Sequence, residues 1–143
     1  MLNARLFAGL AAMTFAVAIF GRLHVLPRAN LWLQVGNVSF GAFYWELFIF
    51  FVCTFFALAY FGIARLTQRP LNLATGIIGF LLLALASVVW LISSFLNTDG
   101  SRWSGRFAIL LFAAMACFIA GVAFSTANVA WALLRSLLKR ANS

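Results

Sequence analysis

Four long apolar blocks, separated by short joints that carry arginine, constrain this chain more than any other feature. A helix needs about 20 apolar residues to cross about 30 Å of hydrocarbon, and each block approaches or exceeds that length. Barrel strands would need only about 9 to 11 residues with alternating polarity. We therefore predict an all-α integral membrane four-helix bundle. The expected helices cover approximately residues 5–22, 40–64, 72–96 and 106–135.

The composition leaves no room for a separate soluble domain. Hydrophobic residues make up 66% of the 143 residues and charged residues 8%, whereas a soluble domain carries roughly a quarter charged residues. We expect one membrane domain over residues 1–143.

The net charge of +8 would suggest nucleic acid in a soluble protein. Here most basic residues fall at predicted helix ends, where long cationic side chains extend toward lipid phosphates. We therefore expect phospholipids and other membrane-protein subunits as partners, and no nucleic acid. These residues are Arg22, Arg65, Arg69, Arg106, Arg135, Lys139 and Arg140.

The distribution of basic residues also predicts an orientation. Six Lys and Arg residues fall at one end of the expected bundle and four at the other. Cytoplasmic joints carry the excess of positive charge. We expect a multi-pass protein of a bacterial inner membrane with both termini in the cytoplasm.

Glu46 is the one carboxylate within an apolar block. An ionisable group at membrane depth is costly, so it is a functional candidate by default. Its place near the start of the second helix leaves two interpretations open. Glu46 has a role toward a proton, a quinone or another ligand, or it makes a structural bond, for example with Arg28, Arg102 or Arg106.

His24 is the single histidine and follows the first helix. One His cannot form a metal site alone, so we expect an interfacial structural role, with axial cofactor ligation or pH sensing as alternatives. Cys53 and Cys117 lie at lipid depth, where buried small hydrophobes are the expected role. The sequence has no Ser/His/Asp set and no phosphate-binding glycine loop. We predict no enzyme activity, cofactor or metal site.

The fourth helix carries small residues that would let another helix approach closely. Whether this helix-packing row faces the chain's own helices or a partner is left open. Near the end of that helix, Asn128 is expected to donate a hydrogen bond to another helix. The row at four-residue spacing is Ala113, Cys117, Gly121 and Ser125. A second, less regular row is Ala116, Ala120, Ala123 and Ala127.

The second helix is rich in phenylalanine on all faces. Lipid contact explains this distribution, and docking onto a larger membrane complex, a quinone or a pigment is the alternative.

Residues 35–134 resemble the last helices of the haem-copper oxidase catalytic subunit, particularly short bacterial proteins similar to that region. Residues 36–40, residues 65–72, and Asn128 followed by Arg135 carry this resemblance. The family's haem and copper ligands are histidines, including a His-x-His pair on the helix that residues 43–45 would occupy. This sequence has Phe, Tyr, Trp and Glu there. The resemblance therefore implies a scaffold or accessory subunit without the redox site.

Together these features favour a non-catalytic accessory subunit of a larger respiratory or photosynthetic complex, which stabilises partner helices and bound lipids. One alternative is a small homo-oligomeric transport or ligand-binding protein that uses Glu46. The other is a quinone- or haem-binding membrane anchor, which would need His24 and a ligand from another chain.

Overall fold

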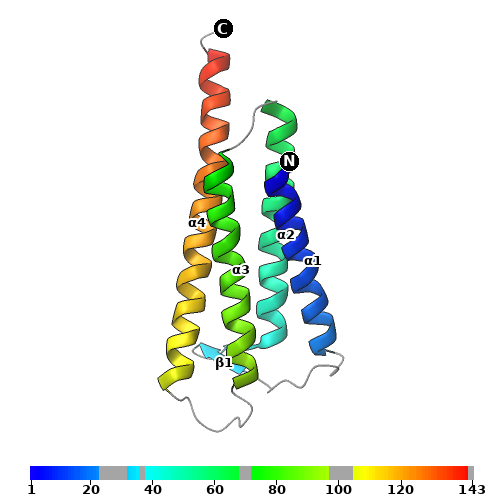
Figure 1. Ribbon diagram of the computed structural model, residues 1–143, viewed down its shortest axis with the longest axis vertical. Helices are drawn as coiled ribbons and strands as arrows, with labels where there is room; N and C mark the ends of the chain where they lie inside the picture. Colours follow the sequence, from blue (N-terminus) through cyan, green and yellow to red (C-terminus); the bar gives the residue numbers. More distant parts are fainter. Residues whose placement is uncertain (23–31, 36–37, 68–71, 97–104, 142–143) are drawn as a thin grey trace.

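Four helices lie side by side in the computed structural model, which describes residues 1–22, 32–35, 38–67, 72–96 and 105–141 (Figure 1). The all-α four-helix bundle predicted from the sequence is confirmed. The helices are α1 (Leu2–Arg22), α2 (Ala42–Thr67), α3 (Leu73–Leu96) and α4 (Gly105–Ala141).

Each helix contains a segment long and apolar enough to cross a membrane. The chain is therefore a multi-pass membrane protein. Helix α1 begins at the end of the bundle where α4 finishes, as Figure 1 shows. The candidate spans are Leu2–Phe20, Trp45–Leu66, Leu73–Ser93 and Ile109–Leu138.

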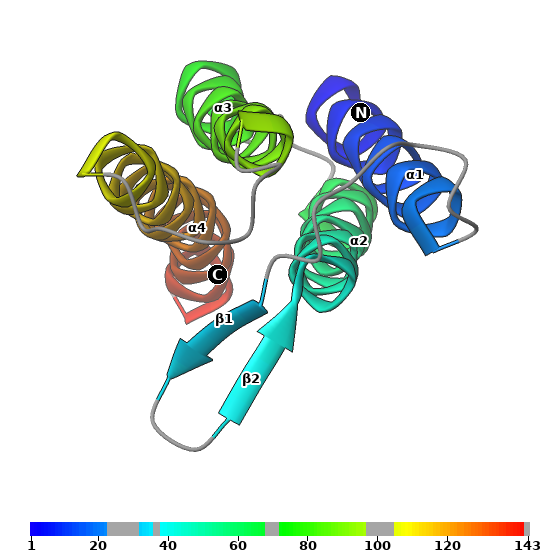
Figure 2. The same ribbon diagram turned by 90° about the horizontal axis from the view of Figure 1, so that it is seen from below.

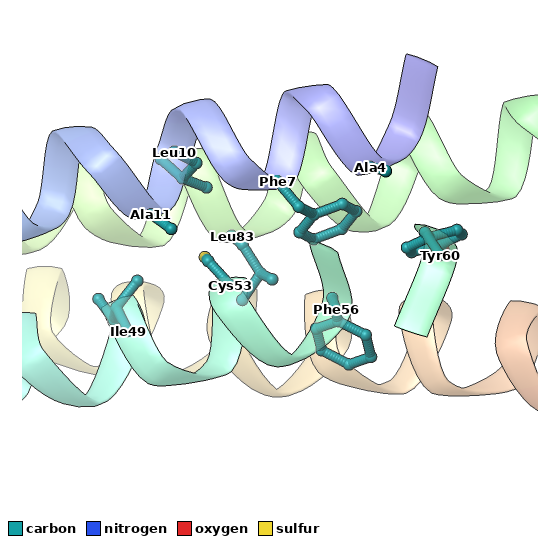
Figure 3. Close-up of a cluster of buried hydrophobic side chains, with 9 residues drawn as sticks. All are labelled: Ala4, Phe7, Leu10, Ala11, Ile49, Cys53, Phe56, Tyr60 and Leu83. Atoms are coloured by element: carbon teal, nitrogen blue, oxygen red, sulfur yellow. The ribbon is translucent and has the colours of Figure 1, made fainter. Parts of the chain in front are cut away.

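The helices pack as two pairs, α1 against α2 and α3 against α4 (Figure 2). The main buried cluster joins the first pair to α3, with residues of α1 facing residues of α2 (Figure 3). At its centre the ring of Phe7 stacks on Tyr60, with centroids 5.3 Å apart, and contacts Phe56 at 5.6 Å. Aromatic contacts of this kind add to the burial of apolar area.

A second buried cluster lies toward the other end of the bundle and contains Trp90, Leu111 and Ala114. Trp45 of α2 packs against it, with its ring centroid 5.1 Å from that of Trp90 and 5.4 Å from that of Phe118. An aromatic layer therefore connects α2 to both helices of the second pair.

The joint between α1 and α2 contains a β-hairpin that was not predicted. Strand β1 (Trp32–Val35) pairs antiparallel with β2 (Val38–Gly41), and Val35 lies opposite Val38. A Gly-Asn pair between two short runs rich in β-branched and aromatic residues is a hairpin signal, and the ladder satisfies backbone groups that hydrocarbon would leave unpaired. The hairpin lies at one end of the bundle (Figure 1).

Helix α4 is longer than predicted. It has 37 residues and continues to Ala141, past the expected end near residue 135. At 1.5 Å per residue it is about 55 Å long, and it rises beyond the other helices in Figure 1. The extension follows from its composition, since Leu, Lys, Arg and Ala all favour helix and no Gly or Pro interrupts them.

Candidate functional site

A buried polar cluster joins the helices at the end of the bundle where α1 begins. Asn128 of α4 donates hydrogen bonds from Nδ2 to the hydroxyl of Tyr60 on α2, at 3.1 Å, and to the backbone carbonyl of Asn72, at 2.9 Å. Asn128 and Tyr60 are both buried. The predicted interhelical hydrogen bond of Asn128 is present, and one side chain connects α2, α4 and the start of α3.

Asn72 has two further roles in this cluster. Its side-chain Oδ1 accepts hydrogen bonds from the backbone N–H groups of Ala74 and Thr75, at 3.1 and 3.4 Å. This is N-cap geometry, and it satisfies donors that the first helical turn leaves free. Its backbone carbonyl also accepts from the N–H of Gly76 at 3.1 Å.

Gly76 leaves space for the amides of this cluster. A Cβ atom at Gly76 would meet the side-chain amide of Asn3 on α1 and would lie 3.2 Å from Nδ2 of Asn128. Asn3 is itself buried. The absence of a side chain at Gly76 therefore lets polar groups of α1 and α4 meet over the first turn of α3.

The contact between α3 and α4 is closest at two glycines. A Cβ at Gly121 would lie 2.8 Å from Cγ of Leu83 and 3.1 Å from the carbonyl oxygen of Gly79. A Cβ at Gly79 would meet Oγ of Ser125 and would lie 3.2 Å from the carbonyl oxygen of Gly121. We call Gly79, Gly121 and Ser125 the glycine seam. Gly121 and Ser125 of the glycine seam face the chain's own α3. For these two residues, the small-residue row on α4 therefore packs within the bundle.

The helix-packing row predicted from the sequence follows the seam only in part. Gly121 and Ser125 are buried, whereas Cys117 is half-buried and Ala113 is exposed. Four residues turn a helix by about 40° more than one full turn, so a strict four-residue row rotates away from the interface by roughly 120° over three steps. The buried positions follow steps of three, seven, four and three residues instead, which keeps them on one face. They are Leu111, Ala114, Gly121, Ser125 and Asn128.

Glu46 lies on the wall of a groove between α1 and α3, whose floor is formed by α2. The groove has a volume of about 370 Å³ and is almost wholly apolar. Glu46 is 4% exposed and sits little more than one turn from the start of α2, closer to the helix end than predicted. Trp90 lines the same end of the groove.

The phenylalanines of α2 divide between the core and the surface. Phe56 is buried, whereas Phe48, Phe51, Phe55 and Phe61 are exposed on the outer face of the bundle. A contact of this face with a quinone or pigment stays a prediction.

His24 and Arg28 lie outside the described residues, as do the side chains of Arg102 and Arg106 that were considered as partners of Glu46. In the part of the chain that the structure describes, no three His, Cys, Asp or Glu residues come together as metal ligands would.

We compared the chain with known protein families, curated proteins and solved structures. No family model, curated protein or solved structure matches the chain. The resemblance to the last helices of the haem-copper oxidase subunit therefore stays a prediction.

Sequence reasoning missed Tyr60, Gly76 and Gly79 as members of the polar cluster and the seam. The spacing of Gly76 and Gly79, one turn apart at the start of an otherwise large-residue helix, was a signal for a close helix contact. Tyr60 carries the one polar group among the aromatic residues near the end of α2, and a buried tyrosine hydroxyl usually has a hydrogen-bond partner.

Proposed function

We propose that this chain is a non-catalytic accessory subunit of a larger bioenergetic membrane complex, in which α4 docks against partner helices. The observation that carries this proposal is the apolar surface of α4 beyond the rest of the bundle. Its candidate span, Ile109–Leu138, has 30 residues and is about 45 Å long, some 15 Å more than the hydrocarbon core.

The end of α4 is marked by an interfacial pair. The guanidinium group of Arg135 lies 4.8 Å from the ring centroid of Trp131, and both residue types prefer the level of the lipid headgroups. Leu137 and Leu138 follow on the same helix and are 61% and 57% exposed. A protein surface would cover leucines at this level more favourably than water or headgroups do.

The outward face of α4 supports the same proposal. Ala116, Ala123 and Ala127 are exposed and Ala120 is half-buried. Small residues in this spacing permit close approach of a second helix. Gly121 and Ser125 already pack against α3. The second row of small residues is therefore the one that a partner helix could approach.

Two finer parts of the proposal rest on the sequence. The choice of a respiratory or photosynthetic complex rests on the resemblance to the oxidase helices. The bacterial inner membrane and the cytoplasmic termini rest on the excess of basic residues at one end; Arg5, Arg65 and Arg135 lie at the end where α1 begins and α4 finishes.

Site-specific photo-crosslinking in the native membrane tests the docking role. A photoreactive residue at Leu137 should link the chain to one other integral membrane protein in stoichiometric yield. The control position is Ile78, which is 44% exposed on α3 and should link to lipid. Lipid adducts alone at Leu137 would contradict the proposal.

The second candidate is a small ligand-binding or transport protein that acts as a homo-oligomer. The observation that favours it is the position of Glu46 on the groove wall. Links from Leu137 to copies of the same chain would support this candidate against the first.

A further inference from the structure

The groove between α1 and α3 has the dimensions of a single lipid chain. Its α1 wall runs from Arg5 to Val17, which is about 18 Å along the helix axis. One leaflet of the hydrocarbon core is about 15 Å thick. The groove therefore extends over one leaflet's depth, and its open side faces the position of the surrounding acyl chains.

Charge distinguishes the two ends of the groove. Arg5, an exposed residue, lines it near the start of α1. Helices α1 and α2 are antiparallel, since Phe15 contacts Phe50 and Phe7 contacts Tyr60, so Glu46 lies at the opposite end. An anionic group is attracted by the guanidinium of Arg5, and no other basic residue is among the described residues that line the groove, which orients a negatively charged amphiphile with its head at Arg5.

We propose that this groove binds one acyl chain of an anionic phospholipid, with the headgroup phosphate at Arg5 and the chain directed toward Glu46. The guanidinium group suits a phosphate through charge-assisted hydrogen bonds. The acyl chain would fill the groove, where α1 and α3 do not pack against each other. This inference deepens the lipid-binding part of the proposed function and rests on the membrane placement of the bundle, independently of any partner subunit.

Gly9 gives the means to test the groove without disturbing the helices. It lines the groove, and a Cβ atom there would meet no atom within 4 Å. A large side chain at this position enters open space and competes with the lipid chain. Gly62 of α2 offers a matched control, because a Cβ there also meets nothing within 4 Å and Gly62 does not line the groove.

The test uses the full chain purified in mild detergent and mixed with equal amounts of phosphatidylglycerol and phosphatidylcholine. Native mass spectrometry counts the lipids that remain bound. The wild-type chain should retain one phosphatidylglycerol, with a preference of about fivefold over phosphatidylcholine, the factor expected for one basic residue near a headgroup.

Three variants separate the contributions. Gly9→Phe should lose the bound lipid, and Gly62→Phe should retain it as wild type does. Arg5→Gln should keep a lipid chain and lose the preference for phosphatidylglycerol. The proposal is overturned if the wild-type chain retains no lipid, if the two glycine variants behave alike, or if Arg5→Gln keeps the headgroup preference. Because no partner subunit is present, these outcomes are independent of whether α4 docks in a complex.

Discussion

The side-chain amide of Asn128 on α4 donates a hydrogen bond to the hydroxyl of Tyr60 on α2, 68 positions away in the sequence. The bond connects the two helix pairs, since α2 packs with α1 and α4 packs with α3. Apolar packing alone holds helices together weakly in lipid, whose tails are as apolar as the helix surfaces. A buried hydrogen bond of this kind therefore fixes how the two pairs associate.

Removing this bond should destabilise the bundle by a modest amount. Asn128→Leu removes the donor and leaves the Tyr60 hydroxyl and the Asn72 carbonyl without it. We expect a loss of about 1 kcal/mol in unfolding free energy, the range for interhelical hydrogen bonds in membranes. Unfolding by denaturant in detergent micelles provides the measurement.

A double-mutant cycle with Tyr60→Phe isolates the pair. The double variant should lose less stability than the sum of the two single variants. Strictly additive losses would show that the two side chains act independently. Ser136→Ala is the control, because the Ser136 hydroxyl bonds within its own helix, to the carbonyl of Leu133 at 2.7 Å.

The glycine seam predicts that a large residue at Gly121 cannot be accommodated. Gly121→Leu would place side-chain atoms where Leu83 and the backbone of Gly79 already lie. Overpacking of this kind costs about 1 to 3 kcal/mol, so the thermal midpoint in detergent should fall. Ile109→Leu, at a position 69% exposed, should leave it unchanged. Equal midpoints for the two variants would mean that α3 and α4 do not meet at Gly121.

A smaller change at Gly79 tests the same contact from the other helix. Its Cβ would lie 3.2 Å from both the carbonyl oxygen of Gly121 and the backbone nitrogen of Ser125, and backbone atoms cannot rotate away. We expect Gly79→Ala to lower the thermal midpoint. Gly62→Ala should raise it slightly, because Ala favours helix over Gly by about 1 kcal/mol and the added methyl group enters open space. A rise for Gly79→Ala as large as that for Gly62→Ala would contradict the seam.

The four spans and the basic residues at one end predict the topology. Reporter fusions after Ser143 and near Ser101 should report opposite compartments, with Ser143 in the cytoplasm. A reporter found outside after Ser143 would reverse the orientation. Reporters found on one side at both positions would change the number of spans.

The sequence predicted the spans well because membrane helices depend on length and apolarity, which a sequence displays directly. It predicted the hydrogen bond of Asn128 because an amide within an apolar helix needs a partner. The sequence left open which way the row of Ala113, Cys117, Gly121 and Ser125 faces. Only Gly121 and Ser125 are buried, because a four-residue repeat rotates around the helix.

Other features depended on contacts between distant segments. The Gly36-Asn37 pair between runs of β-branched and aromatic residues could have predicted the hairpin. The groove requires the relative positions of α1, α2 and α3, so no single segment reveals that Arg5 and Glu46 lie at its opposite ends. For Glu46, the sequence identified a buried carboxylate but not the surface it lines.

The native assembly in mild detergent tests the central claim most directly. The chain, solubilised from its own membrane and separated by size, should migrate in an assembly with other integral membrane proteins at fixed stoichiometry, and mass spectrometry should identify them. An accessory subunit predicts this result because the exposed leucines at the end of α4 and its outward row of small residues would then pack against partner helices. Migration as a monomer, or as an oligomer of this chain alone, would contradict it.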